Sequence, residues 1–482
     1  MKKIWTLLIA VSSLVTTSSA FCGFYVAKAG AELFNNKSQV IFVRDGNRSV
    51  ITMSNDYKGS ASEFAMVIPV PEVLDRKDIR IANQVLFDKF DSYSGPRLVE
   101  YYDENPCEPR ILYETVVANT SRRGRLKRSI MQKEESDKYH VQIEASYTVG
   151  EYDIVILSAA ESDGLKRWLI DNGYSIPQQA EPVLEPYIKN DLKFFVVKVN
   201  TDVKDLLGFT NLRPLQIEFE SEKFMLPIRL GMANSKGAQD MIIYTFTKGG
   251  RVESANYRTI PIPSNRDIPT FLKGEKFQQF YVDLFDKSYH KAGKNTIFTE
   301  YAWDVSPGFG GAKCDPCVGP PPIVEDLKQA GVWWVNDKNY NSVFFTRLHV
   351  RYAEQDFPQD LFFMQTSDRS RFQGRYIMRH PATGYLSCDE GVKYKDNLIN
   401  RRTKELSELA ALTDWNVSKY TKYVSDGSGR IDEKAGRMIK DDSQKKSNSS
   451  KGNAWPMGLL LGSILLFILS NLIFDLRKEF FS

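Results

Sequence analysis

The sequence predicts an α+β fold of mostly antiparallel strands with a few helices in two subdomains, plus one C-terminal transmembrane helix. Three observations lead to this prediction. Short runs rich in β-branched and aromatic residues recur along the chain, as is typical of strands. Helical patterns interrupt them after residue 160. An apolar run of 18 residues without charge stands at 457–474.

The first 20 residues have the pattern of a secretory signal peptide. Lys2 and Lys3 precede an apolar run over 4–15, and small residues at 18–20 form a cleavage site. We therefore expect residues 1–20 to be removed. The body is then expected in the periplasm or outside the cell.

The C-terminal run predicts a single membrane span with the C-terminus in the cytoplasm. Its 18 residues give about 27 Å of helix, close to the ~30 Å hydrocarbon core of a bilayer. We expect a flexible linker over 425–454, a transmembrane helix that contacts the membrane over 455–474, and a cytoplasmic tail over 475–482. Gly458 and Gly462 form a G-x-x-x-G pair, which allows a homodimer through this helix.

The body between these ends is longer than one hydrophobic core usually supports. We expect a β-rich subdomain over 21–150 and an α+β subdomain over 151–420. The first begins with a hairpin over 38–57, turned by Asp45-Gly46-Asn47. Further strands are expected at 63–71, 111–119, 139–150, 192–200, 240–247, 295–305, 342–352 and 360–367, and a second hairpin at 214–231. Helices are expected at 162–172 and 180–191, and the longest helix of the body at 271–289.

Composition and motifs exclude several classes of function. The 64 Lys and Arg residues against 60 Asp and Glu leave a net charge of only +4, which gives no argument for nucleic acid. A charge-dense segment over 120–137 predicts an exposed loop rather than a binding patch. The alternative is a contact of its basic residues with anionic lipid or an envelope polymer. The expected partner of the protein is an envelope protein or polymer. The histidines His140, His290, His349 and His380 have no metal-ligand spacing. We therefore expect no cofactor and no metal, and assign no catalytic residue.

Two basic strand-like segments form a hypothetical anion-binding surface. In "FFTRLHVRY" the alternation places Arg347, His349 and Arg351 on one face. In "QGRYIMRH", Arg375 and Arg379 share a face in the same way. If the two strands pair, these side chains line one surface that can bind an anion. The alternative is an ordinary solvated face of a half-buried sheet.

Five cysteines are candidates for disulfide bonds: Cys22, Cys107, Cys314, Cys317 and Cys388. Export favours disulfides, and the pairing cannot be chosen from the sequence. "KCDPC" can be a structural disulfide, a redox dithiol or half of a zinc site. Asp315 disfavours a thiolate beside it, and the following "VGPPP" delays any helix that could activate one. We favour the structural disulfide.

Many short blocks in order resemble the family called domain of unknown function 2330. They include "FCGFYVAKAGAELFNNKSQVIFVRDGNRSVITMSNDYKG", "GEYDIVILSA", "LPIRLG", "EYAWD", "CDPC", "TRLHVRY" and "FQGRYIMRHPATG". The resemblance spans about residues 21–390. It implies an exported bacterial protein and no particular activity, because the family is uncharacterised.

The sequence therefore favours a membrane-anchored extracytoplasmic protein that acts by binding or scaffolding. The alternative is an extracytoplasmic enzyme. It would be either a thiol–disulfide oxidoreductase that uses Cys314 and Cys317 or a hydrolase without a recognised motif.

Overall fold

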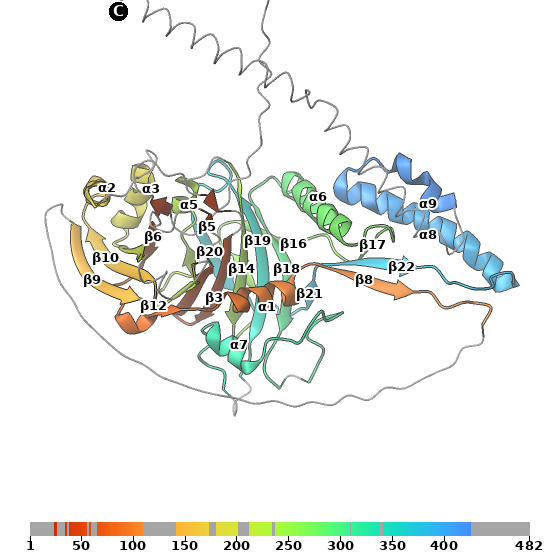
Figure 1. Ribbon diagram of the computed structural model, residues 1–482, viewed down its shortest axis with the longest axis horizontal. Coiled ribbons are helices and arrows are strands. Elements are labelled where there is room, and N and C mark those ends of the chain that lie inside the picture. The colour runs from red at the N-terminus through yellow and green to blue at the C-terminus, as the bar shows by residue number, and fades with distance from the viewer. Residues whose placement is uncertain are drawn as a thin grey trace, which may run out of the picture.

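Two stacked β-sheets form the centre of the molecule (Figure 1). The computed structural model describes residues 24–26, 34–35, 38–54, 57–58, 65–108, 141–172, 180–200, 212–233, 237–308, 310–336 and 341–425. Apolar side chains from both sheets meet in one cluster, which includes Phe42, Ile68 and Phe195. Burying each such side chain stabilises the fold by roughly 1.5–3 kcal/mol.

The smaller of the two stacked sheets is antiparallel and has five strands. In spatial order they are β1 (Phe24–Val26), β6 (Ala65–Val70), β11 (Lys193–Val199), β10 (Tyr152–Ala159) and β9 (Val141–Val149). Its outer face carries the helices α2 (Ser162–Asp171) and α3 (Ala180–Lys189), whose Leu165 and Leu184 pack against Phe194.

The larger sheet has nine strands, with parallel pairs at β14–β3 and β16–β18 and antiparallel pairs elsewhere. In spatial order its main path is β16 (Arg258–Pro261), β18 (Thr296–Asp304), β19 (Phe344–Tyr352), β14 (Gln239–Thr247), β3 (Ser38–Asp45), β4 (Arg48–Ser54), β12 (Leu215–Glu220) and β7 (Ile79–Ile81), and β21 (Phe372–Gln373) pairs with β18. β3 and β4 form the predicted hairpin, with Gly46 at φ +58° in its turn, a left-handed conformation that suits glycine.

Three small sheets complete the strands of the described chain. Their members are β13 (Met225–Leu226), β20 (Leu361–Gln365) and β15 (Val252–Ser254); β17 (Arg266–Asp267), β22 (Arg375–His380) and β8 (Arg97–Tyr102); and β2 (Phe34–Asn35) with β5 (Tyr57–Lys58).

The remaining helices cover the other surfaces. They are α1 (Gln84–Ser94), α5 (Arg229–Ala233), α6 (Glu275–Lys291), α7 (Val324–Gln329), α8 (Asp389–Thr413) and α9 (Thr421–Ser425), with the 3-10 helices η2 (Arg76–Asp78) and η3 (Val417–Tyr420). α1 and α7 lie on the outer face of the nine-stranded sheet. α6, α8 and α9 surround β22 in a further apolar cluster. Figure 1 shows them at the end of the molecule opposite α2 and α3.

The predicted fold class is corrected to a mixed α+β fold of sheets and helices, whose described residues include no transmembrane helix. In the described part of the chain no helix is long and apolar enough to cross a membrane; α8, the longest, carries charged residues along its length. The predicted span 455–474 lies outside the described residues, as do the signal peptide, the linker after Ser425, the tail and the glycine pair. Strands from both sides of residue 150 share both large sheets, because strand pairing joins distant segments that local patterns do not relate.

Two local predictions also need correction. β12 and β13 do not form the second hairpin, since β12 pairs with β4 and β7, and β13 pairs with β20. The longest described helix is α8 and not α6. The strand predicted at 111–119 and the loop at 120–137 lie outside the described residues.

Candidate functional site

The side chains of β19 alternate between the two faces of the nine-stranded sheet. Leu348 and Val350 enter the cluster between the sheets. Arg347, His349 and Arg351 lie on the opposite face, where they contact α1 and α6. The predicted alternation is confirmed. The polar face is covered and not solvated, because the helices lie over it and leave Arg347 only 5% exposed.

Glu300 is the fully buried centre of this polar face. The register of β18 on β19 shifts at this position, so Glu300 stands in a β-bulge, which re-aims a side chain. Its carboxylate lies 2.5 Å from Arg347 Nε and 2.8 Å from His349 Nδ1, and the Tyr281 hydroxyl donates to it. Burial raises the pKa of Glu300, but Arg347 and His349 outweigh burial and lower this pKa to about 2.

His349 connects this centre to a second carboxylate. Its ring stacks on Phe285 with 3.7 Å between centroids, and its Nε2 lies 3.4 Å from Asp240 Oδ1. Burial disfavours the imidazolium, but Glu300 and Asp240 outweigh it and raise the pKa of His349. Both ring nitrogens are therefore engaged, and His349 is an ionic link between two carboxylates.

The row of charges continues to the surface through Arg351. The Asp240 carboxylate accepts hydrogen bonds from Arg351 Nε and Nη2 at 2.9 and 2.8 Å. Burial raises the pKa of Asp240, but His349 and Arg351 outweigh it and lower this pKa. Arg351 Nη1 then donates to Asp286 Oδ1 at 2.9 Å, whose side chain is 52% exposed. We call the series Glu300, His349, Asp240, Arg351 and Asp286 the ionic chain.

A half-open cleft of about 420 Å³ lies at the exposed end of the ionic chain. The C-terminal part of α6, the end of β19 and the following turn form its walls. Three carboxylates and three basic side chains line it together with Tyr289: Asp286, Glu354, Asp356, His290, Lys294 and Arg351. This volume falls within the ~300–1,000 Å³ that small-molecule sites occupy.

The other two predicted anion-binding arginines lie elsewhere. β22 pairs with β17 and β8 and not with β19, so the predicted common surface does not form. Arg375 Nη1 binds Asp315 Oδ2 at 2.6 Å, and Arg379 Nε binds Asp267 Oδ1 at 3.1 Å. All five predicted side chains already contact carboxylates. β19 and β22 do not pair, because β19 pairs with β14 and β18, whereas β22 pairs with β17 and β8.

The "KCDPC" segment contains the disulfide Cys314–Cys317, with Cα atoms 5.0 Å apart. The Lys313 carbonyl accepts hydrogen bonds from the hydroxyls of Tyr93 and Tyr301, at 2.9 and 2.7 Å. Cys314 is only 4% exposed and belongs to the apolar cluster under α1 and α7. The loop is thus fixed to the end of the nine-stranded sheet.

A second disulfide joins Cys107 to Cys388 across 281 residues. Cys22 lies outside the described residues. Among those that the structure describes, no group of three or more His, Cys, Asp and Glu side chains could hold a metal ion.

The remaining histidines have ordinary surroundings. His380 Nε2 lies 2.6 Å from Glu100, and the His380 ring stacks on Tyr102. His290 lies on the wall of the cleft, and His140 lies outside the described residues.

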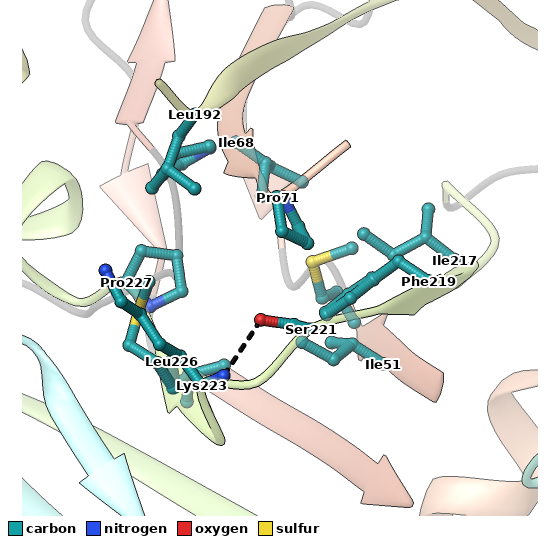
Figure 2. Close-up of a pocket in the computed structure, with 13 residues that line it drawn as sticks. Ile51, Ile68, Pro71, Leu192, Ile217, Phe219, Ser221, Lys223, Leu226 and Pro227 are labelled. Atoms are coloured by element: carbon teal, nitrogen blue, oxygen red, sulfur yellow. Dashed lines mark hydrogen bonds between the residues drawn. The ribbon is translucent and has the colours of Figure 1, made fainter. Parts of the chain in front are cut away.

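Figure 2 shows a second, apolar crevice between the two stacked sheets. Ile51 and Phe219 of the larger sheet face Ile68 of the smaller one there, and the Lys223 amide donates to Ser221 Oγ at 3.1 Å beside them. Its volume of about 30 Å³ is close to that of one water molecule. It is a packing gap between the sheets and too small for a ligand.

Three acidic members of the ionic chain were missed from the sequence: Glu300, Asp240 and Asp286. Only Glu300 leaves a local signal, since it is a charged residue in the middle of the strand "TIFTEYAWD", where the other charge, Asp304, stands at the end. Asp240 and Asp286 are ordinary residues at a strand start and on a helix surface. Only pairing and packing bring them to Arg351.

Two stacked sheets, flanked by helices, define a mixed α+β protein. The ionic chain lies on the outer face of its larger sheet, between the sheet and α6. The chain belongs to the family described as uncharacterized protein conserved in bacteria, domain of unknown function 2330, whose model matches residues 16–364. The predicted family is confirmed. No curated protein and no solved structure matches the chain.

Proposed function

We propose that this protein is an extracytoplasmic binding module, and that its ligand site is the polar cleft at the exposed end of the ionic chain. The proposal rests on two side chains of the cleft wall, Arg351 and Asp286, which hydrogen bonds from neighbouring side chains hold in place. Arg351 is held by two hydrogen bonds to Asp240, which is itself held by His349. Arg351 in turn holds Asp286. Supported side chains of this kind present a preorganised binding surface.

The lining favours a ligand rich in hydroxyl groups. Carboxylate acceptors and the donor groups of Lys294, Arg351 and His290 line the cleft side by side, so its walls can both accept and donate hydrogen bonds. A hydroxyl group both donates and accepts a hydrogen bond, and can use both kinds of wall. A saccharide unit of an envelope polymer has this chemistry.

The geometry supports binding over the alternative enzyme functions. A histidine that acts as a general base needs a free ring nitrogen within reach of substrate. Both ring nitrogens of His349 contact carboxylates. In the loop of Cys314 and Cys317, Cys314 is buried among apolar side chains, where a thiolate is disfavoured.

The two disulfides support the extracytoplasmic part of the proposal. Such bonds persist in oxidising compartments and are rare in the cytosol. Fractionation of the native bacterium tests this part separately. Recovery of the protein with the cytosol would contradict it.

Saturation-transfer NMR with neutral, acidic and amino saccharides of bacterial envelopes tests the ligand site. We expect neutral saccharides to bind. Asp356→Asn and Lys294→Met, which remove one acceptor and one donor, should each raise the Kd at least about tenfold, or ~1.4 kcal/mol. Glu325→Gln, on exposed α7, is the matched control and should leave the Kd unchanged. Binding that ignores both cleft variants, or binding only of charged saccharides, would contradict the proposal.

A further inference from the structure

The disulfide Cys107–Cys388 stands at the start of the longest described helix. Cys388 is the N-cap of α8, and its Sγ accepts a hydrogen bond from the Gly391 amide at 3.3 Å. The other sulfur packs against the same residue, since a Cβ on Gly391 would lie 2.9 Å from Cys107 Sγ. Both cysteines are half-buried. The bond therefore sits against the N-terminal amides of a helix of 25 residues.

This position favours one direction of thiol–disulfide exchange. The positive end of a helix and its free amides stabilise a thiolate, and the sulfur that forms the more stable thiolate is the better leaving group. An incoming thiolate that attacks Cys107 Sγ expels Cys388 as a thiolate onto the Gly391 amide. Attack on Cys388 would lose this advantage.

We propose that Cys107–Cys388 is a thiol–disulfide exchange site for a dithiol protein, with the first attack on Cys107. The first thiolate of the dithiol forms a bond to Cys107 Sγ, the Cys107–Cys388 bond breaks, and its electron pair leaves on Cys388. The second thiol of the dithiol loses its proton and attacks the mixed disulfide, which releases Cys107 as a thiolate. When the two released thiolates take up the two protons that the dithiol lost, this chain has gained two electrons and two protons, and the dithiol has become a disulfide.

The second disulfide of the same chain provides an internal comparison. Cys317 is exposed, but attack on it would expel Cys314 into the apolar cluster that buries it, where a thiolate is disfavoured. Acidic residues stand next to both bonds, Asp315 in one case and Glu108, Asp389 and Glu390 in the other, so the neighbouring charge does not favour thiolate formation at Cys107–Cys388. The two bonds differ in the helix N-terminus beside Cys388 and the apolar cluster around Cys314.

Reduction should loosen the tip of α8 without releasing it. Asp103 also holds this part of the helix, because Arg401 Nη2 lies 2.8 Å from its carboxylate and the Tyr394 hydroxyl donates to it at 2.6 Å. The C-terminal half of α8 packs against α6 and α9. We therefore expect faster hydrogen exchange in the first turns of α8 and an unchanged core.

The test uses the full chain with a thioredoxin-type dithiol protein whose resolving cysteine is replaced by serine, so that the mixed disulfide is trapped. Peptide mass spectrometry should find the adduct on Cys107 and a free thiol on Cys388. With dithiothreitol under native conditions, Cys107–Cys388 should be reduced at least about ten times faster than Cys314–Cys317. An adduct on Cys388 or Cys317, or reduction of both bonds at the rate of global unfolding, would overturn the proposal.

Two variants separate the proposed chemistry from a simple difference in exposure. Asp389→Asn removes a negative charge beside the leaving thiolate and should speed the reduction of Cys107–Cys388 about two- to threefold. The double variant Cys314→Ser/Cys317→Ser leaves the proposed site intact and should give the same adduct at the same rate. Slower reduction of Asp389→Asn, or loss of the adduct in the double variant, contradicts the assignment.

Discussion

Glu300 and Glu405 are both buried glutamates, yet they differ in ionisation. Glu300 is 0% exposed and Glu405 is 1% exposed. Each accepts a hydrogen bond from a tyrosine hydroxyl, Tyr281 and Tyr423 respectively. The pKa of Glu300 is lowered to about 2 by its cationic partners in spite of burial, whereas burial raises the pKa of Glu405 to about 7.

The difference comes from where the neighbouring arginines point. Arg347 contacts the Glu300 carboxylate directly, at 2.5 Å. Arg401 Nε remains 3.6 Å from Glu405, and Arg402 donates to the Tyr423 carbonyl at 3.0 Å. Arg401 and Arg402, four and three residues before Glu405 on the same helix, therefore do not offset the rise in the pKa of Glu405 that burial causes. A buried carboxylate is kept charged by contact with a cation, and proximity in the sequence is not enough.

The largest expected effect is that of Glu300→Gln. It should lower the free energy of unfolding by about 3–5 kcal/mol at pH 7, because it removes the buried carboxylate that Arg347 and His349 share and leaves them only Asp91 and Asp240 as counter-charges. Urea denaturation followed by circular dichroism measures the loss. Glu405→Gln is the matched control and should leave stability at pH 7 unchanged or raise it by up to about 3 kcal/mol, because a neutral amide avoids the cost of the raised pKa of Glu405. Equal losses in the two variants would remove the distinction.

The second prediction concerns pH. The folded-state pKa of Glu405 lies above its ordinary value of 4.5, so its stabilising contribution is complete below pH 4.5 and is lost as the pH rises through 7. The loss amounts to about 3 kcal/mol by pH 9, at ~1.4 kcal/mol for each unit between the folded and unfolded pKa. For Glu300 the sign is opposite, since its lowered pKa makes its contribution present above 4.5 and lost as the pH falls toward 2.

Urea titrations of the wild type and Glu405→Gln between pH 4 and 9 measure this effect. The stability of the wild type relative to Glu405→Gln should fall with rising pH across that interval. A constant difference would mean that Glu405 is ionised in the folded protein, as Glu300 is.

The smallest effects are expected from the two tyrosines. Tyr281→Phe should cost about 1.5–3 kcal/mol at pH 6, because it removes a hydrogen bond to a charged carboxylate. Tyr423→Phe should cost about 0.5–1.5 kcal/mol at pH 6, where Glu405 is neutral, since a bond between neutral groups is weaker. The loss of stability in Tyr423→Phe should be larger at pH 8 than at pH 6, whereas the loss in Tyr281→Phe should be the same at both pH values. Chemical denaturation at both pH values separates these outcomes, and equal pH dependence would contradict the comparison.

Local patterns were sufficient to predict many elements of this fold. The hairpin of β3 and β4 follows from a two-residue turn that contains Gly46, and the alternation along β19 follows from the period of a strand. α2 and α6 were found because each presents an apolar face at helical spacing. These features depend on residues within about ten positions of one another.

Sheet order and the ionic chain could not be predicted in this way. The parallel pairing of β14 with β3 joins segments about 200 residues apart. The Glu300 bulge exists only because β18 shifts its register on β19. The hypothetical pairing of β19 with β22 does not occur, since β19 pairs with β14 and β18, and β22 pairs with β17 and β8.

The sequence by itself determined the family, the local elements and the five cysteines available for disulfides, because composition and short-range spacing encode these directly. Only the tertiary structure decided that Cys107 meets Cys388, that Glu300 meets Arg347 and His349, and that Arg401 stays 3.6 Å from Glu405. The physical reason is that ionisation and disulfide reactivity depend on burial and on contacts of a few ångströms. Those contacts are set by the packing of segments that lie far apart in the chain.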